Sequence, residues 1–305
     1  MKSRKTELKE VIMSIEVVIK QKGFFKKDLP MEIILGDDLT YGTYDWGNRI
    51  QPKVMGKNGF VVYNESCIGR GISVDWLSKN KKSVYLKVLN PTSENELRNF
   101  YAMATRIADY WKCSLEVDGA KLSIQEFNDG FDNMLQFNNR ALLKLASEII
   151  EKKSHYVLFS AMYPLSFGVQ EAEEVLKDPE FLDRWMNEKQ SEEFYYAVPR
   201  FYSTPEGIQG VYVCTAGCKG IFPQKPIVPF DITDPKTGKP LECNSYIINF
   251  FDPSTLETLG PVSYSEFIDN LDQESVSYFD ADHILVEPFS ADDIRNFLEK
   301  INAME

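Results

Sequence analysis

Two cysteines four residues apart are the residues of this sequence whose type and spacing most readily suggest chemistry. They are Cys214 and Cys218, in the run Cys-Thr-Ala-Gly-Cys. Two thiolates at this spacing could hold a soft metal ion, and His283 or Cys243 would then have to complete the site. A structural zinc site usually contains two such pairs, whereas this chain has one. The alternative is that Cys214 points into the core from a strand while Cys218 lies in a loop, and we predict no cofactor.

The second chemical hypothesis is a cysteine hydrolase, in which Cys218 or Cys214 is the nucleophile and His283 is the base. Asp280 or Asp282 would orient the imidazole ring. The order of these residues in the chain is acceptable, because such triads are defined by geometry. The chain has only two histidines, which limits enzyme hypotheses, since histidine is the commonest general acid and base at neutral pH. No local nucleophile signature supports this hypothesis.

Two further short patterns could bind ions, and each has a simpler interpretation. Asp280 and Asp282 would lie on the same side of an extended chain and could help to bind a divalent cation. The regular oxygen spacing and glycine of a calcium loop are missing there, so a turn is the simpler interpretation. The run Gly69-Arg70-Gly71 lacks the third glycine and the helix of a dinucleotide-binding fingerprint.

Acidic residues are concentrated in one segment. From Pro240 to Ile294 there is no Lys or Arg in 55 residues, and the remaining 34 acids balance the 34 basic residues of the chain. The formal net charge of -12 therefore belongs to this segment. Its twelve acids are Glu242, Asp252, Glu257, Glu266, Asp269, Asp272, Glu274, Asp280, Asp282, Glu287, Asp292 and Asp293.

This acidic segment has two interpretations. The first is a solvated face whose acids cap helix starts and turns. The second is a docking surface for a cationic partner, such as a basic protein, a toxin domain or a polyamine, because arrayed carboxylates steer such a partner and raise its rate of association. The partner-binding residues predicted on the second interpretation are Asp269, Asp272, Asp280 and Asp282.

Composition excludes several classes of protein. With 305 residues, 43% of them hydrophobic and 26% charged, the chain has the composition of an ordinary globular protein. The excess of acids argues against a nucleic-acid partner, since phosphates repel carboxylates. No stretch approaches the roughly 20 apolar residues of a membrane helix, so no membrane partner is predicted. Five cysteines, an odd number, together with the lack of a signal-peptide pattern favour a reduced protein in the cytoplasm.

Hydrophobic periodicity predicts a β-rich start followed by helices. Strands are expected at residues 15–19, 31–35, 60–63, 71–76 and 83–89. A helix should begin after Ser93, which forms a capping box with Glu96. A hairpin at 114–122 should turn at Asp118-Gly119, a good type I′ pair. A second capping box at Ser123 and Glu126 opens a helical region, broken near residue 130, that runs to about residue 152.

The second half alternates between strands and helices without a repeat. Strands are expected at residues 155–159, 194–202, 210–214, 246–251 and 283–286, and helices at 169–176, 180–188, 263–271 and from 290 onward. Residues 216–243, rich in Gly and Pro, are predicted to form a long loop. The irregular order predicts an α+β fold with a mixed or mainly antiparallel sheet flanked by helices. Two subdomains, 13–152 and 153–305, would meet near residue 152.

The β-rich start, the helix after Asn90, the Asp118-Gly119 hairpin and the acidic C-terminal segment together resemble an uncharacterised family of bacterial cytoplasmic proteins, known as a domain of unknown function. The resemblance covers most of the chain from Met13. It implies no activity and supplies no functional residues.

The first twelve residues are interpreted as a leader that is foreign to the native protein. Lys9-Glu10-Val11 can be encoded by codons that contain a bacterial ribosome-binding site just before Met13, which would then be the true start. The alternative is a genuine helical extension through residues 7–12.

Taken together, these features predict a soluble, non-catalytic binding module that uses its acidic C-terminal face for a cationic macromolecule. The alternative is a metal- or thiol-dependent enzyme with Cys214, Cys218 and His283 at its site. Convergence of these three side chains in a cleft would favour the enzyme.

Overall fold

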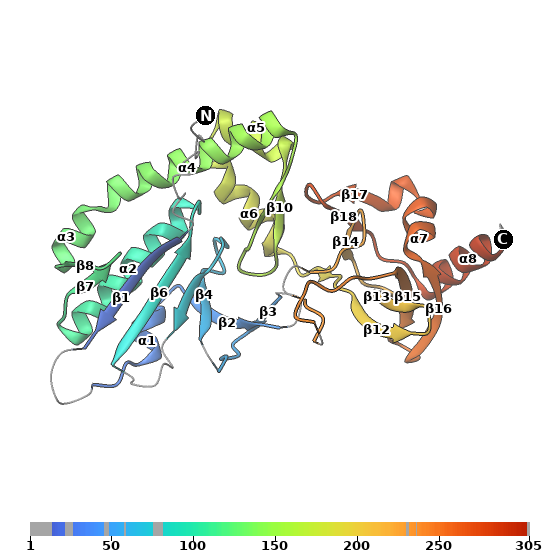
Figure 1. The fold of residues 1–305 in the computed structure, drawn as a ribbon, viewed down its shortest axis with the longest axis horizontal. Helices are drawn as coiled ribbons and strands as arrows, with labels where there is room; N and C mark the ends of the chain where they lie inside the picture. Colours follow the sequence, from blue (N-terminus) through green and yellow to red (C-terminus); the bar gives the residue numbers. More distant parts are fainter. Residues whose placement is uncertain are drawn as a thin grey trace, which may run out of the picture. The chain divides into compact units, whose positions relative to one another are not determined.

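The computed structural model describes residues 14–303 except 22–26, 46–48, 58, 76–81, 230–231 and 236. The predicted leader and start, residues 1–12 and Met13, lie outside the described residues. The chain has an α+β fold and divides into two compact units, Met1–Glu192 and Glu193–Glu305 (Figure 1). None of the helices in the described ranges is both long enough and apolar enough to cross a membrane.

The N-terminal unit is built on an eight-stranded sheet in which neighbouring strands run antiparallel. In order across the sheet the strands are β3 (Ile50–Pro52), β2 (Thr40–Tyr44), β4 (Phe60–Tyr63), β5 (Ile72–Asp75), β6 (Ser83–Leu89), β1 (Ser14–Lys20), β7 (Leu115–Val117) and β8 (Ala120–Leu122).

Alternation in the central strands creates one buried face of this sheet. Val17 of β1 and Leu86 of β6 are paired across the sheet and almost completely buried. The helix α2 (Glu94–Trp111) contributes its apolar stripe, including Phe100 and Ile107, to the same core. Residues that are apolar at helical spacing therefore meet residues that are apolar at every second position, as the sequence predicts.

The segment 31–35, predicted as a strand, is instead the short helix α1 (Met31–Leu35). Five residues, four of them apolar, are too few to separate the two periodicities. The chain around them favours a helix: Pro30 precedes it, and Gly36 follows at a positive φ of 64°. The Arg106 guanidinium of α2 donates hydrogen bonds to the carbonyls of residues 33 and 34, which the helix end leaves without internal partners.

The Asp118-Gly119 hairpin has both central residues at positive φ, 48° and 81°, as a type I′ turn requires. It joins β7 to β8 and leads into α3 (Ile124–Asp129) and α4 (Phe131–Lys152), which are separated at Gly130. The unit continues with the hairpin β9 (Tyr156–Leu158) and β10 (Leu165–Phe167) and the helices α5 (Val169–Lys177) and α6 (Phe181–Ser191).

The boundary between the units follows Glu192 rather than residue 152. Side chains of α6 explain this difference, because they bind the backbone of the first half of the chain. The Gln190 amide donates to the carbonyl of Gly69, and the Asn187 oxygen accepts the N–H of Ile68. Asp183 accepts the main-chain N–H of Glu94 at the start of α2.

The C-terminal unit contains two four-stranded sheets. One has the order β11 (Tyr195–Tyr196), β14 (Gly220–Pro223), β18 (His283–Val286) and β17 (Val276–Tyr278). The other has the order β12 (Arg200–Thr204), β13 (Gly207–Thr215), β15 (Ser245–Asp252) and β16 (Glu257–Ser263). Its helices are α7 (Tyr264–Asn270), α8 (Ala291–Asn302) and the 3₁₀ turn η1 (Gln273–Ser275).

Two predictions for this unit need correction. The strand expected at 194–202 is divided into β11 and β12, with Pro199 between them, which cannot donate a ladder hydrogen bond. The predicted loop 216–243 contains β14, all four of whose residues are buried. A strand of four residues that begins with Gly and ends with Pro shows little hydrophobic periodicity in the sequence. It lies within the long connection that the parallel neighbours β13 and β15 require.

A buried carboxylate fastens the loop at Gly69–Gly71 to helix α2. The Ser93 hydroxyl accepts the N–H of Glu96, as predicted, but the Glu96 carboxylate does not complete the capping box. It accepts the N–H groups of Arg70 and Gly71 and the hydroxyl of Thr92. Burial raises the pKa of Glu96, whereas the hydrogen bonds from these three donors lower it by a smaller amount. The Gly69-Arg70-Gly71 run therefore binds a carboxyl group, which is supplied by the protein itself.

We predict that Glu96→Ala destabilises the N-terminal unit by about 3 kcal/mol, because the buried N–H groups of Arg70 and Gly71 lose their acceptor. Denaturation followed by tryptophan fluorescence measures this unit alone, since all four tryptophans precede Glu192. The control is Glu94→Ala in the same turn, where an exposed ion pair with Arg98 is lost at a cost of about 0.5 kcal/mol. Equal losses for the two variants would contradict this role for Glu96.

Candidate functional site

The two predicted thiol ligands lie in different environments. Cys214 is on β13 and is buried in the core of the C-terminal unit, whereas Cys218 is exposed. Between them the chain makes a turn, in which the Cys218 N–H donates to the carbonyl of Thr215 and Gly217 has a positive φ of 76°. Burial raises the pKa of the Cys214 thiol to about 12, so this sulfur is held as a thiol at neutral pH.

The structure does not bring Cys214, Cys218 and His283 together as a set of metal ligands. Across the described part of the chain, no three His, Cys, Asp or Glu residues are grouped so that they could hold a metal ion. His283 is the first residue of β18, whereas Cys214 is on β13 in the other sheet. The convergence that would favour the thiol- or metal-dependent enzyme is therefore not found.

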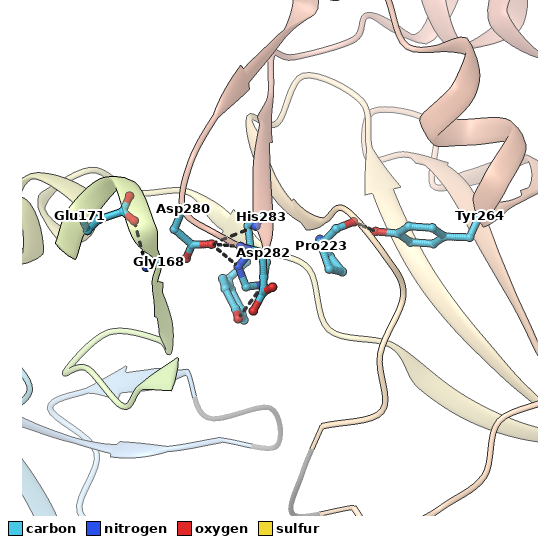
Figure 2. A network of polar contacts seen from close by, with 8 residues as sticks. Gly168, Glu171, Pro223, Tyr264, Asp280, Asp282 and His283 are labelled. Atoms are coloured by element: carbon cyan, nitrogen blue, oxygen red, sulfur yellow. Dashed lines mark hydrogen bonds and ion pairs between the residues drawn. The ribbon is translucent and has the colours of Figure 1, made fainter. Parts of the chain in front are cut away.

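His283 is instead joined to Asp280, one of the two carboxylates predicted to orient it. The His283 Nδ1 lies 2.8 Å from the Asp280 Oδ1 (Figure 2). The same oxygen accepts the main-chain N–H groups of Asp282, at 3.0 Å, and of His283, at 2.9 Å. The other predicted orienting residue, Asp282, contributes this backbone donor. One carboxylate oxygen of the turn between β17 and β18 is thus bound by two backbone N–H groups and the imidazole.

The third member of this arrangement is a tyrosine that sequence analysis did not select. The Tyr196 hydroxyl lies 3.2 Å from the His283 Nε2. Tyr196 is on β11. The pair is separated by 87 residues, and no local motif connects them.

The four predicted docking acids are not equivalent. Asp269 on α7 and Asp272 before η1 are exposed, and Asp282 is half-buried. Asp280 is completely buried, so the expectation that it belongs to an exposed docking surface is corrected. Its carboxylate is directed to internal donors, because a buried charge requires partners.

Several other acids of the segment 240–294 have local structural roles. Glu266 and Asp293 complete capping boxes with the serines that begin α7 and α8. Asp252 accepts from the backbone and hydroxyl of Ser254. Hydrogen bonds from serine groups hold the pKa of all three carboxyls below their ordinary values. Two more form surface ion pairs, Glu287 with Lys219 and Asp292 with Arg295.

A groove of about 400 Å³ lies beside Asp269. It is lined by residues of α7, of the start of β15 and of the segment that follows β14. The lining residues are Gln224, Lys225, Pro226, Asn244, Ser245, Tyr246, Tyr264, Ser265, Ile268 and Asp269. The Tyr264 hydroxyl is fixed by donation to the carbonyl of Pro223 at 2.6 Å (Figure 2). The groove therefore combines aromatic surface with one carboxylate and several hydrogen-bonding groups.

Alkylation should separate the two thiols. We predict that iodoacetamide at mildly alkaline pH modifies Cys218 rapidly and Cys214 hardly at all. A rise in pKa from 9.0 to about 12 lowers the thiolate fraction of Cys214 by about 1000-fold, and burial adds a steric block. Peptide mass mapping measures both rates, and unfolding in urea is the control that should equalise them. Comparable rates in the folded protein would show that Cys214 is accessible.

Acid should weaken the C-terminal unit through its capping acids. Because the folded-state pKa values of Asp252, Glu266 and Asp293 are depressed, their stabilisation is present above the ordinary values of 3.8 to 4.5 and is lost as pH falls through the folded values. We predict that the variant Asp252→Asn/Glu266→Gln/Asp293→Asn has a flatter dependence of Tm on pH below about 4.5.

Circular dichroism measures the Tm of the C-terminal unit at each pH. Its unfolding transition is the one that tryptophan fluorescence does not report. Removing the donors of two of the caps, by Ser263→Ala and Ser290→Ala, is the matched control and should flatten the same dependence. An unchanged slope in both sets of variants would contradict the assignment.

The comparisons with known proteins identify a family and no activity. No curated protein and no solved structure matches the chain. A family model described as a domain of unknown function, DUF4299, matches residues 14–297. This match includes almost all of both units, and with them the Tyr196, His283 and Asp280 arrangement and the acidic segment. The chain therefore belongs to the DUF4299 family.

Proposed function

We propose that this chain is a binding protein whose C-terminal unit docks a cationic macromolecule, such as a basic protein segment, without catalysing a reaction on it. The observation that carries the proposal is the absence of Lys and Arg from the whole of Pro240–Ile294. Within this segment Asp269, Asp272 and Glu274 are exposed and follow one another along α7 and η1. The proposed setting is the cytoplasm, with no nucleic acid or membrane as the partner.

The groove beside Asp269 gives this surface a place for a cationic side chain. A Lys or Arg head group could pair with the Asp269 carboxylate while its aliphatic part covers Tyr246 or Tyr264. Lys225 lines the same groove, together with Gln224. Both are hydrogen-bond donors, and they suit the main-chain carbonyls of a basic peptide rather than an isolated cation.

Such a surface mainly raises the rate at which a cationic partner associates, rather than the affinity of the complex. Each exposed ion pair contributes about 0.2–1 kcal/mol, because water and salt screen it. Several carboxylates of one sign on one face still raise the association rate at low ionic strength. The proposal therefore predicts a partner that binds faster at low salt.

The test is association of a fluorescent peptide of about ten lysines, followed by stopped-flow anisotropy at low and at physiological salt. We predict that Asp269→Asn/Asp272→Asn/Glu274→Gln slows association by about tenfold at low salt and flattens its salt dependence. Asparagine at position 272 keeps an oxygen for the cap of η1.

The matched control removes three exposed acids from outside the segment, in Asp109→Asn/Glu151→Gln/Glu206→Gln, which changes the net charge equally. This variant should bind the peptide almost as fast as the unaltered protein. Equal slowing of both variants, or no measurable binding by the unaltered protein, would overturn the proposed docking surface.

A further inference from the structure

We propose that Tyr196, His283 and Asp280 form a nucleophile, base and orienting carboxylate, in which the Tyr196 oxygen accepts an acyl group from an ester substrate. This activity goes beyond the docking function and rests on different residues. It also differs from the cysteine-based enzyme considered from the sequence, because the nucleophile is a phenol from β11.

The hydrogen bonds define the direction of proton transfer. Asp280 accepts through Oδ1 and already receives two backbone N–H groups, so its carboxylate is fixed in position. Because the Asp280 carboxylate can only accept, a neutral His283 ring that donates to it at 2.8 Å carries its proton on Nδ1 and keeps a lone pair on Nε2. That lone pair faces the Tyr196 hydroxyl at 3.2 Å, within the reach of a general base.

Burial decreases from the carboxylate to the phenol. Asp280 has an exposed fraction of 0%, His283 of 5% and Tyr196 of 9%. All three residues are therefore largely buried, and Tyr196, at the end of the relay, has the largest exposed fraction of the three.

The sheet fixes the two ends of this relay on β11 and β18, the two strands that flank β14. Tyr196 pairs with Ile221 of β14, and Pro223 of the same strand pairs with His283 of β18. The two rings have centroids 5.4 Å apart and are tilted by 48°. Side chains held by strands of one sheet need little reorganisation before they react.

The proposed step is acyl transfer. The Tyr196 oxygen attacks the carbonyl carbon of an ester, and its proton passes to the His283 Nε2. The carbon–oxygen bond to the leaving group then breaks, and the departing alkoxide takes that proton and leaves as an alcohol. Attack of water on the tyrosyl ester, with His283 again taking the proton, releases the acid and returns the proton to Tyr196. The net reaction is hydrolysis of an ester.

The test uses p-nitrophenyl acetate and the full chain. We predict a rapid release of nitrophenolate close to one equivalent per protein, with one acetyl group on the peptide that contains Tyr196. Tyr196→Phe should abolish both the burst and the label, whereas Tyr195→Phe at the adjacent position should retain them. Cys218→Ser and His155→Asn test the exposed thiol and the second histidine, and each should leave the labelling of Tyr196 unchanged.

The base is tested by a readout that a structural role would not give. His283→Gly should slow acetylation by about 100-fold, and added imidazole should restore it in part. Asp280→Asn tests the positioning residue and should lower the rate while circular dichroism shows a folded C-terminal unit. Absence of a burst, labelling confined to other residues, or a rate at Tyr196 that His283→Gly leaves unaltered would overturn the proposal. The triple acid variant tests the docking surface alone. Its result with oligolysine therefore does not bear on the acylation of Tyr196.

Discussion

A carboxylate removed from water must be given hydrogen-bond donors, and this constraint organises both units of the protein. In the N-terminal unit Glu96 collects two backbone N–H groups from the loop at residues 70 and 71 and the Thr92 hydroxyl. In the C-terminal unit Asp280 collects two backbone N–H groups and the His283 imidazole. Each buried charge fixes a segment that hydrophobic packing alone would leave less defined.

The same constraint divides the acids of the segment 240–294 into two kinds. Some of them hold the local structure, as Glu266 and Asp293 do at helix starts and Asp280 does inside the β17–β18 turn. Others, such as Asp269, face solvent beside the groove. A segment without cations can therefore serve the fold and still present an acidic surface, because its stabilising donors are serine hydroxyls and backbone N–H groups rather than Lys or Arg.

Sequence predicted well those features whose partners are close in the chain. The capping boxes at Ser123, Ser263 and Ser290 are present, and so is the Asp118-Gly119 turn, since each depends on residues three or fewer apart. The box at Ser93 is incomplete, because Glu96 finds donors 25 and 26 residues away that no local rule includes. Strand β14 was missed for a similar reason, since its burial depends on strands distant in the sequence.

The same distinction applies to the candidate site. The pairing of Asp280 with His283 spans three residues and was within reach of sequence reasoning. The contact of His283 with Tyr196 spans 87 residues and depends on the arrangement of β11, β14 and β18. The separation of Cys214 from Cys218 into a buried and an exposed thiol was the alternative interpretation of the sequence, and the structure has this arrangement, because β13 includes Cys214 and ends before Cys218.

The tautomer of His283 is the property on which the account of the relay depends most directly. Nitrogen-15 NMR of the imidazole, in the full chain near neutral pH, measures it without any substrate. We predict a proton on Nδ1, hydrogen-bonded to Asp280, and an unprotonated Nε2 that accepts from Tyr196. A neutral ring protonated on Nε2 would contradict it, because that nitrogen could not take the proton of the phenol.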